Sequence, residues 1–546
     1  MKQQRSFQIQ RLPLIVALLL GGLLPLQAQM WELKQKLGSS DQEPADNLGI
    51  SVAISGSYLI AGAWWEEGQN GGGQGMTSAG AAYIYKRQPN GNWEETQKLI
   101  SPNIEALGYF GFNVAIDGDY ALVGAFNEDH SGAGNAGRVY AYHRDINDQW
   151  ILGDSLMIDN PGNNDYFGRN LAIAGEYALI GAYGNDFDEN DANSLNDAGA
   201  VFLFQRQADN SYSLIRKLVA FDRAVDDNFG KYLDIDNQGL VVGAFNKDQG
   251  IGLVDAGAAY GISCTDPVCD FENITSADLQ KIRAPDQNNF ESFGWDVAIS
   301  GNWVIAGKSG ESDQPGGGTG SGTGAAYFYH WENGQWVGKQ KVFAPDFSNG
   351  ARFGRAIAID GPVCVIGAGT ESEDANGQNT LFGAGAAYIF ELQANNQWMP
   401  VQKIVGTQRG VNDLFGEDAV AVSGIQVVIG AWLADTIGND DIIDGGAVYV
   451  YERDTEITAV RNFVEDTPIY ALSNPSLDGL LQIYSLDPFS STATPMQIVS
   501  MNGNVVFHTE NINEGQIDLS YLPAGVYFVT ITRSGFLPQT LKWVRM

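Results

Sequence analysis

The chain has 546 residues, of which 67 are glycine and only 18% are charged. A hydrophobic content of 44% excludes an intrinsically disordered chain, and the glycine excess excludes a coiled coil. The formal net charge of −34 disfavours binding to nucleic acid or to an anionic membrane, because like charges repel. Abundant Gly, Tyr and Phe instead favour an all-β protein with short strands and tight turns.

Residues 1–28 have the three-part pattern of a secretory signal peptide. Basic residues precede an apolar run over Leu12–Leu26, and Ala28 is a small residue at the expected cleavage point. The run is too short for a confident membrane span, and no later segment reaches about 18 consecutive apolar residues. We therefore expect an exported, soluble protein without a transmembrane segment.

One phrase then recurs seven times along the chain, with a period of about 60 residues. In its clearest copy, Phe110-Gly111 opens the phrase and Gly124-Ala125 closes its second strand. The first glycine recurs at Gly49, Gly111, Gly168, Gly230, Gly294, Gly354 and Gly416. The second glycine recurs at Gly62, Gly124, Gly181, Gly243, Gly307, Gly367 and Gly430.

Each copy predicts four antiparallel strands, which we name A to D. Val114–Ile116 and Tyr120–Val123 are strands A and B, and the Asp-Gly between them indicates a tight hairpin. Strand C begins with Gly-Ala, as at Gly80–Tyr85, and strand D carries a Trp followed by Gln-Lys-Leu, as over Trp93–Leu99. Seven such units predict a β-propeller, whose radial closure protects the sheet edges.

The two ends of the repeat region complement each other. The seventh copy stops at Val448–Tyr451 without a strand D, whereas Trp31–Leu37 has the spelling of strand D and precedes the first copy. We therefore predict a seven-bladed propeller over residues 30–451, closed by the N-terminal strand.

The Phe-Gly and Gly-Ala markers resemble the FG-GAP repeat of integrin α-subunit propellers and of bacterial secreted proteins. Repeats of the integrin type hold Ca²⁺ in a loop between strands A and B. Here that connection is as short as Asp117-Gly118-Asp119, and a two-residue turn cannot supply six to eight oxygen ligands. We expect the calcium sites of the family to be absent from these turns.

The B–C and D–A loops should share one face of the propeller, which we call the loop face. Its B–C loops are rich in Asp and Glu, with Lys247 and Lys308 as their basic residues. This charge either marks a binding surface or serves solubility alone. In the densest acidic loop, Asp186, Asp188 and Asn190 imitate the start of a Ca²⁺ loop but lack its later Gly and Glu, so calcium is a candidate ligand only there.

An aromatic residue follows the Gly-Ala marker in five copies, and we take these five as candidate binding residues. They are Trp64, Phe126, Tyr183, Phe245 and Trp432. Because strand B leads to the loop face, these rings either stack on sugars or a protein partner there, or pack between blades.

Three cysteines are too few for a disulfide framework. Cys264 and Cys269 are close enough for a local disulfide, and Cys364 lies in an apolar run that predicts burial. No catalytic residue is assigned, since the four histidines do not form a zinc-type pair and no Gly-x-Ser-x-Gly motif is present.

After a linker over 452–466, residues 467–546 predict a small C-terminal β-sandwich. The segments Ile517–Phe528 and Lys542–Arg545 resemble the sorting domain of the type IX secretion system of Bacteroidetes. This resemblance implies passage through the type IX machinery to the medium or to the outer-membrane surface.

These features together predict a secreted or surface-displayed binding or adhesion protein, most simply a monomer. Its loop face would hold a glycan or a protein, with or without a cation. The alternative is an extracellular polysaccharide-active propeller enzyme, a hydrolase or a lyase, which uses acidic residues near the axis. The identity of the ligand does not follow from the sequence.

Overall fold

The computed structural model describes residues 31–453 except 71–73, 251, 265–268, 313–320, 347 and 436–441. Farther on it describes residues 470–472, 480–485, 496–500, 505–509, 515–519, 521–523, 525–531 and 539–545. The chain divides into two compact units, 1–454 and 455–546. The expected signal peptide lies outside the described residues, as does the expected linker from residue 454 onward.

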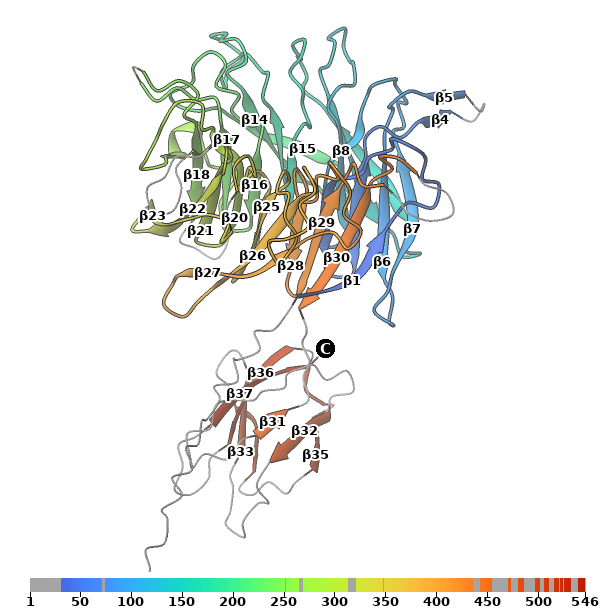
Figure 1. Ribbon diagram of the computed structural model, residues 1–546, viewed down its shortest axis with the longest axis vertical. Coiled ribbons are helices and arrows are strands. Elements are labelled where there is room, and N and C mark those ends of the chain that lie inside the picture. Colours follow the sequence, from blue (N-terminus) through green and yellow to red (C-terminus); the bar gives the residue numbers. More distant parts are fainter. Residues whose placement is uncertain are drawn as a thin grey trace, which may run out of the picture. The chain divides into compact units, whose positions relative to one another are not determined.

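The first unit consists of seven four-stranded antiparallel sheets, one for each copy of the repeat (Figure 1). The first sheet contains β2 (Leu48–Ser55), β3 (Tyr58–Ala63), β6 (Ala81–Arg87) and β7 (Trp93–Ile100). The second contains β8 (Phe110–Asp117), β9 (Tyr120–Ala125), β10 (Arg138–Arg144) and β11 (Trp150–Leu156). The third contains β12 (Leu171–Ala174), β13 (Tyr177–Ala182), β14 (Ala200–Arg206) and β15 (Tyr212–Leu218). The fourth sheet contains β16 (Leu233–Asp236), β17 (Gly239–Ala244), β18 (Ala258–Ser263) and β19 (Gln280–Ile282). The fifth contains β20 (Phe293–Ser300), β21 (Trp303–Lys308), β22 (Ala325–Glu332) and β23 (Gln335–Val342). The sixth contains β24 (Ile357–Asp360), β25 (Val363–Ala368), β26 (Ala386–Leu392) and β27 (Trp398–Ile404).

The seventh sheet takes strands from both ends of the first unit. It consists of β28 (Val420–Ser423), β29 (Gln426–Ala431), β30 (Ala447–Arg453) and the N-terminal β1 (Trp31–Leu37). The β1 strand pairs antiparallel with β30, from Trp31 opposite Arg453 to Leu37 opposite Val448. The last strand of the repeat region thus runs two residues beyond its predicted end at Tyr451, and it takes the beginning of the expected linker into the sheet.

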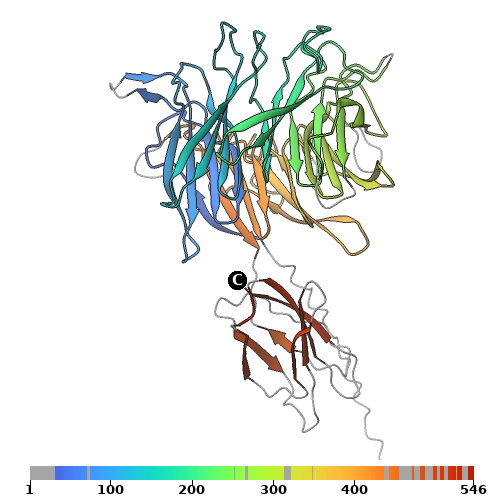
Figure 2. The same cartoon turned by 180° about the vertical axis from the view of Figure 1, so that it is seen from behind.

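The long connections lie at one end of the sheets, where β3, β9, β13, β17, β21, β25 and β29 end. The short hairpin formed by β4 (Gly68–Asn70) and β5 (Gln74–Met76) belongs to these B–C loops. Figure 1 shows the hairpin among the long loops, and Figure 2 shows the same loop face from behind. A single turn of 3-10 helix, η1 (Ser276–Asp278), precedes β19.

We call the interface between two neighbouring sheets a seam. At every seam the sheets approach so closely that the second repeated glycine of one sheet contacts the first repeated glycine of the next. A Cβ atom on Gly181 would lie 1.9 Å from the carbonyl oxygen of Gly230 in the next sheet. A Cβ atom on Gly430 of the seventh sheet would lie equally close, 1.9 Å, to the carbonyl oxygen of Gly49 in the first. Only glycine fits such a contact, so the repeated glycines are a requirement of blade packing.

The glutamine of the Gln-Lys-Leu motif in strand D also joins neighbouring sheets. The side chain of Gln97 donates to the carbonyl of Trp150 at 2.8 Å and accepts from its N–H at 2.9 Å. Gln402 on β27 makes the same pair of bonds to Trp31 at 2.9 and 2.8 Å. Gln35 on β1 in turn binds Trp93 of the first sheet. Each glutamine therefore fastens the outer strand of one sheet to that of the next.

The second unit contains two antiparallel sheets. One orders β31 (Tyr470–Leu472), β32 (Leu480–Ser485) and β35 (Gly515–Asp518), and the other orders β34 (Val505–Thr509), β33 (Met496–Ser500), β36 (Gly525–Ile531) and β37 (Gln539–Arg545). All seven strands lie within residues 467–546, the region of the predicted β-sandwich. The two sheets are the layers that the predicted sandwich requires.

Candidate functional site

A cavity of about 270 Å³ lies where the innermost strands of the seven sheets meet. All seven of these strands contribute to its wall: β2, β8, β12, β16, β20, β24 and β28. The cavity therefore lies on the axis of the propeller. Phe112, Arg169, Tyr232 and Arg355 line it at the end nearest the loop face, since each lies at or just before the beginning of an innermost strand.

We call the loop-face end of the cavity the axial mouth. Three cationic side chains lie over aromatic rings around it. The guanidinium carbon of Arg169 lies 3.9 Å from the ring centre of Phe112, and that of Arg355 lies 4.7 Å from the ring centre of Trp295. The ammonium nitrogen of Lys231 lies 4.6 Å from the ring centre of Phe245. Contacts of this kind attract a cation to the ring face and hold it without using its hydrogen-bond donors.

The three cations differ in their charged partners. Arg355 is paired, with its Nε 2.7 Å from Oε1 of Glu417 and 3.4 Å from Oδ1 of Asp418. Within the described part of the chain, the side chains of Arg169 and Lys231 make no ion pair and no hydrogen bond. The pKa of Lys231 is lowered to about 8, first by burial and then by the charges of Arg169 and Arg355, against the opposing effect of Asp418.

We call the aromatic and cationic residues around the axial mouth the belt. The five predicted aromatic residues form part of this belt. Phe126 and Phe245 are buried, and the other three are half-buried. Trp64 packs against Trp432 across the seam between the first and seventh sheets, with ring centres 6.4 Å apart. The structure thus gathers these residues at the loop-face end of the cavity and packs them between sheets, where their binding function stays a prediction.

Five further belt residues were not predicted: Phe112, Arg169, Lys231, Trp295 and Arg355. They share one sequence position, directly after the first repeated glycine. Their contacts with the predicted set are close, for example 4.8 Å between the ring centres of Phe112 and Phe126. Because the residue type at this position differs between the copies, comparison of the copies does not reveal them.

Two half-buried aspartates of the cavity wall hold neighbouring strands together. Asp234 accepts hydrogen bonds from the N–H groups of Ile235 at 2.9 Å and of Ile299 at 2.8 Å, so it ties β16 to β20. Asp296 ties β20 to β24 in the same way, through Ile357 N–H at 2.6 Å. Both carboxylates are thereby engaged in holding adjacent strands together.

Burial raises the pKa of Asp234 to about 7, although its backbone hydrogen bonds oppose this. The folded state therefore binds this proton more tightly than the unfolded state, and the contribution of Asp234 to stability falls as pH rises from about 4 towards 7. We expect the difference in melting temperature, wild type minus Asp234→Asn, to be larger at pH 5 than at pH 8. Thermal unfolding at both pH values tests this, and parallel pH profiles for the two proteins would contradict it.

The acidic charge of the loop face is partly neutralised within each blade. Lys98, the lysine of the strand D motif, lies 2.7 Å from Asp41 and 2.6 Å from Glu66. In the fifth sheet Lys341 is likewise 2.6 Å from both Asp286 and Glu311. The expectation of a face rich in Asp and Glu counted these carboxylates without the strand lysines that pair with them, so part of the negative charge is balanced within each blade.

The predicted cation loop has a different internal organisation from a calcium loop. Oδ1 of Asp188 accepts from the N–H groups of Asn190 and Ala192, both at 2.9 Å, and Asp186 accepts from the N–H of Asp197. Asp374 of the sixth sheet organises its B–C loop in the same way. The described residues contain no group of three His, Cys, Asp or Glu that could hold a metal ion. Calcium at this loop stays a prediction.

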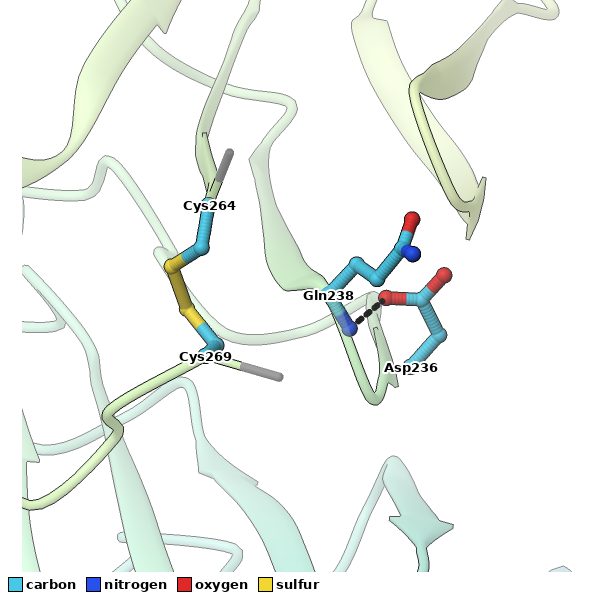
Figure 3. Close-up of a disulfide and its surroundings, with 4 residues drawn as sticks. All are labelled: Asp236, Gln238, Cys264 and Cys269. Atoms are coloured by element: carbon cyan, nitrogen blue, oxygen red, sulfur yellow. Dashed lines mark hydrogen bonds between the residues drawn. A yellow bond between two sulfur atoms is a disulfide. The ribbon is translucent and has the colours of Figure 1, made fainter. Parts of the chain in front are cut away.

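Cys264 and Cys269 are joined by a disulfide (Figure 3). Their N–H groups donate to the carbonyls of Gln238 at 2.8 Å and of Asn237 at 3.0 Å, which fastens the segment after β18 to the hairpin turn between β16 and β17. This is the end of the sheet away from the loop face. Cys364 is a free, buried thiol.

Comparisons with known families agree with this architecture. A family model described as the FG-GAP repeat matches residues 31–85, 93–142, 155–204, 212–262, 277–329, 336–390 and 398–451. Each match begins near a strand D and ends in a strand C, so β1 is the first strand of the first repeat. A second model, described as a secretion system C-terminal sorting domain, matches residues 474–544. A search of curated proteins finds no match.

The sorting domain implies the type IX secretion machinery as a partner and a location outside the cell or at its surface. In the part of the chain that the structure describes, no helix has the length and apolar character needed to cross a membrane. The chain belongs to the FG-GAP repeat family, as a seven-bladed β-propeller followed by a secretion system sorting domain.

Proposed function

We propose that this protein is a non-catalytic binding or adhesion protein that holds an extracellular glycan or protein on its loop face. The observation that carries this proposal is the belt of aromatic and cationic residues around the axial cavity. Every sheet contributes a strand to the cavity wall, so the site is held by the most rigid part of the fold. Calcium assistance at the Asp188 loop and a monomeric state belong to the same proposal.

The test is glycan-array binding by the mature protein, with and without a calcium chelator. Trp432→Ala should weaken binding by about tenfold, as expected for an aromatic residue at the centre of an interface. Phe382→Ala is the matched control, because this ring lies in a loop-face connection and is 72% exposed. Equal loss in both variants, or retention in both, would contradict a site at the axial mouth.

The same polymers should be analysed for breakdown products during the binding experiment. We expect them to be recovered intact, because the three carboxyl groups of the cavity wall are engaged: Asp234 and Asp296 by backbone N–H groups, and Asp418 by Arg355. Turnover of any bound glycan would favour the enzyme alternative instead.

A further inference from the structure

We propose that the axial mouth binds a single anionic group, a carboxylate or a sulfate, carried at the end of an otherwise neutral glycan, with Arg169 and Lys231 as its ligands. This inference rests on the proposed function and specifies its ligand class. It is carried by two cations without a charged partner, Arg169 in the wall of the axial cavity and Lys231 next to the lining residue Tyr232, in a protein of net charge −34.

Other cations near the loop face have polar partners in the described residues. Lys36, Arg223 and Arg409 donate hydrogen bonds to Gln408 or to backbone carbonyls. Seven lysines near the loops all have a carboxylate within 4.0 Å: Lys98, Lys217, Lys247, Lys281, Lys308, Lys341 and Lys403. Arg169 and Lys231 contact aromatic faces instead, so their N–H donors stay unused within the described residues. A guanidinium with free donors suits bidentate binding of a carboxylate or sulfate.

Like charges oppose one another at this mouth. Arg169 and Arg355 both lower the pKa of Lys231, which shows that the three positive charges interact. Of the carboxyl groups nearby, Glu417 and Asp418 pair with Arg355. Asp234 and Asp296 also line the cavity, where backbone N–H groups bind them and burial raises their pKa values, which favours their neutral forms. An incoming anion would relieve this repulsion, which is the physical basis for attraction to the site.

The size and surroundings of the site define the ligand further. A cavity of about 270 Å³ has room for one small group and none for a folded surface. The loops around the mouth are rich in acidic residues, so an extended polyanion would meet repulsion outside the site. A lone anionic group on a neutral chain satisfies both constraints, and the aromatic belt suits the apolar faces of sugar rings.

The charge of Lys231 gives the site a pH response. Arg169, Arg355 and Asp418 are the charged groups that act on it, and Tyr183 and Tyr232, which neighbour it, remain neutral because burial raises their pKa values. With its pKa at about 8, Lys231 loses its proton above that pH. Binding of the anion should therefore weaken as pH rises from 7 to 9. Asp234 of the cavity wall, with its pKa at about 7, gains negative charge over the lower part of this interval, so Lys231→Gln should reduce the dependence mainly between pH 8 and 9 and leave the part due to Asp234.

Calorimetry on the full mature protein provides the test, with four probes: a neutral oligosaccharide, the same oligosaccharide ending in glucuronic acid, polygalacturonate and sodium sulfate. We expect the acidic-ended probe to bind most tightly and to lose affinity at higher ionic strength. Arg169→Gln and Lys231→Gln should each weaken it about tenfold or more, as for loss of a charge-assisted hydrogen bond. Arg206→Gln is the matched control, because its guanidinium carbon lies 3.6 Å from the Tyr120 ring centre at the opposite end of the sheets.

The outcomes separate the two proposals. Equal affinity for the neutral and acidic-ended probes, with sensitivity to Trp432→Ala, would overturn the anion inference and leave the binding function standing. Tightest binding by polygalacturonate would also overturn it, because the acidic loops would then be no barrier. If none of the anionic probes binds, the anion inference is overturned. If no glycan of the array binds either, the proposed binding function is overturned as well. Melting curves of each variant exclude misfolding as the cause.

Discussion

Replacing Trp31 with alanine should lower the free energy of unfolding of the propeller by about 3–5 kcal/mol, the range for truncating a buried tryptophan. Trp31 is 2% exposed and packs in one cluster with Phe415 and Tyr449. Its backbone is bound in addition by Gln402 of the neighbouring sheet. Because β1 joins the seventh sheet through its pairing with β30 and such side-chain contacts, and not through a short hairpin, loss of the indole should also loosen the strand.

Trp93→Ala is the matched control, because Trp93 is also 2% exposed and is bound by Gln35 in the corresponding way. Denaturant unfolding should show a similar loss for both variants. Limited proteolysis should distinguish them, with faster cleavage in the connection between β1 and β2 for Trp31→Ala alone. A loss below about 1 kcal/mol for Trp31→Ala, the usual range for surface substitutions, would show that β1 does not latch the ring.

The fold could be predicted because the propeller repeats one set of local signals seven times. The Phe-Gly and Gly-Ala markers are glycines for a packing reason that acts identically at every seam, so their spacing is visible in the sequence. The strand D spelling is equally constrained, since Gln97 must reach Trp150 and Lys98 must reach Asp41 and Glu66. The isolated Trp31–Leu37 copy was therefore identifiable as the missing strand of the seventh sheet.

The candidate site was predictable only in part, because its residues vary between the copies. Aromatic residues after Gly-Ala indicated the correct end of the sheets, since strand B leads there. Arg169 and Lys231 were missed because the position after the first glycine holds Ile50 in one copy and Glu417 in another, so self-comparison gives no signal there. The partial balancing of the acidic charge was missed for a related reason, as the pairing of loop carboxylates with strand lysines depends on three-dimensional proximity.

Replacing Gly430 with alanine should destabilise the propeller by about 1–3 kcal/mol or more, the usual cost of overpacking. The added methyl group would lie 1.9 Å from the carbonyl oxygen of Gly49 and 2.8 Å from Cβ of Ala419, so the first and seventh sheets would have to move apart. Thermal unfolding of the mature protein measures the loss. This substitution examines the seam that joins the two ends of the repeat region.

Gly181→Ala is the matched variant at an interior seam, because its added methyl group would also lie 1.9 Å from a carbonyl oxygen, that of Gly230. Gly338→Ala is the benign control, since the nearest atom to its Cβ would be Cε1 of the Tyr329 side chain at 3.4 Å. If the seventh and first sheets pack as the other neighbours do, Gly430→Ala and Gly181→Ala should lose similar stability and Gly338→Ala should lose almost none. A mild effect at Gly430 with a severe effect at Gly181 would mean that the seam between the chain ends is open in solution, because a gap there would admit the methyl group.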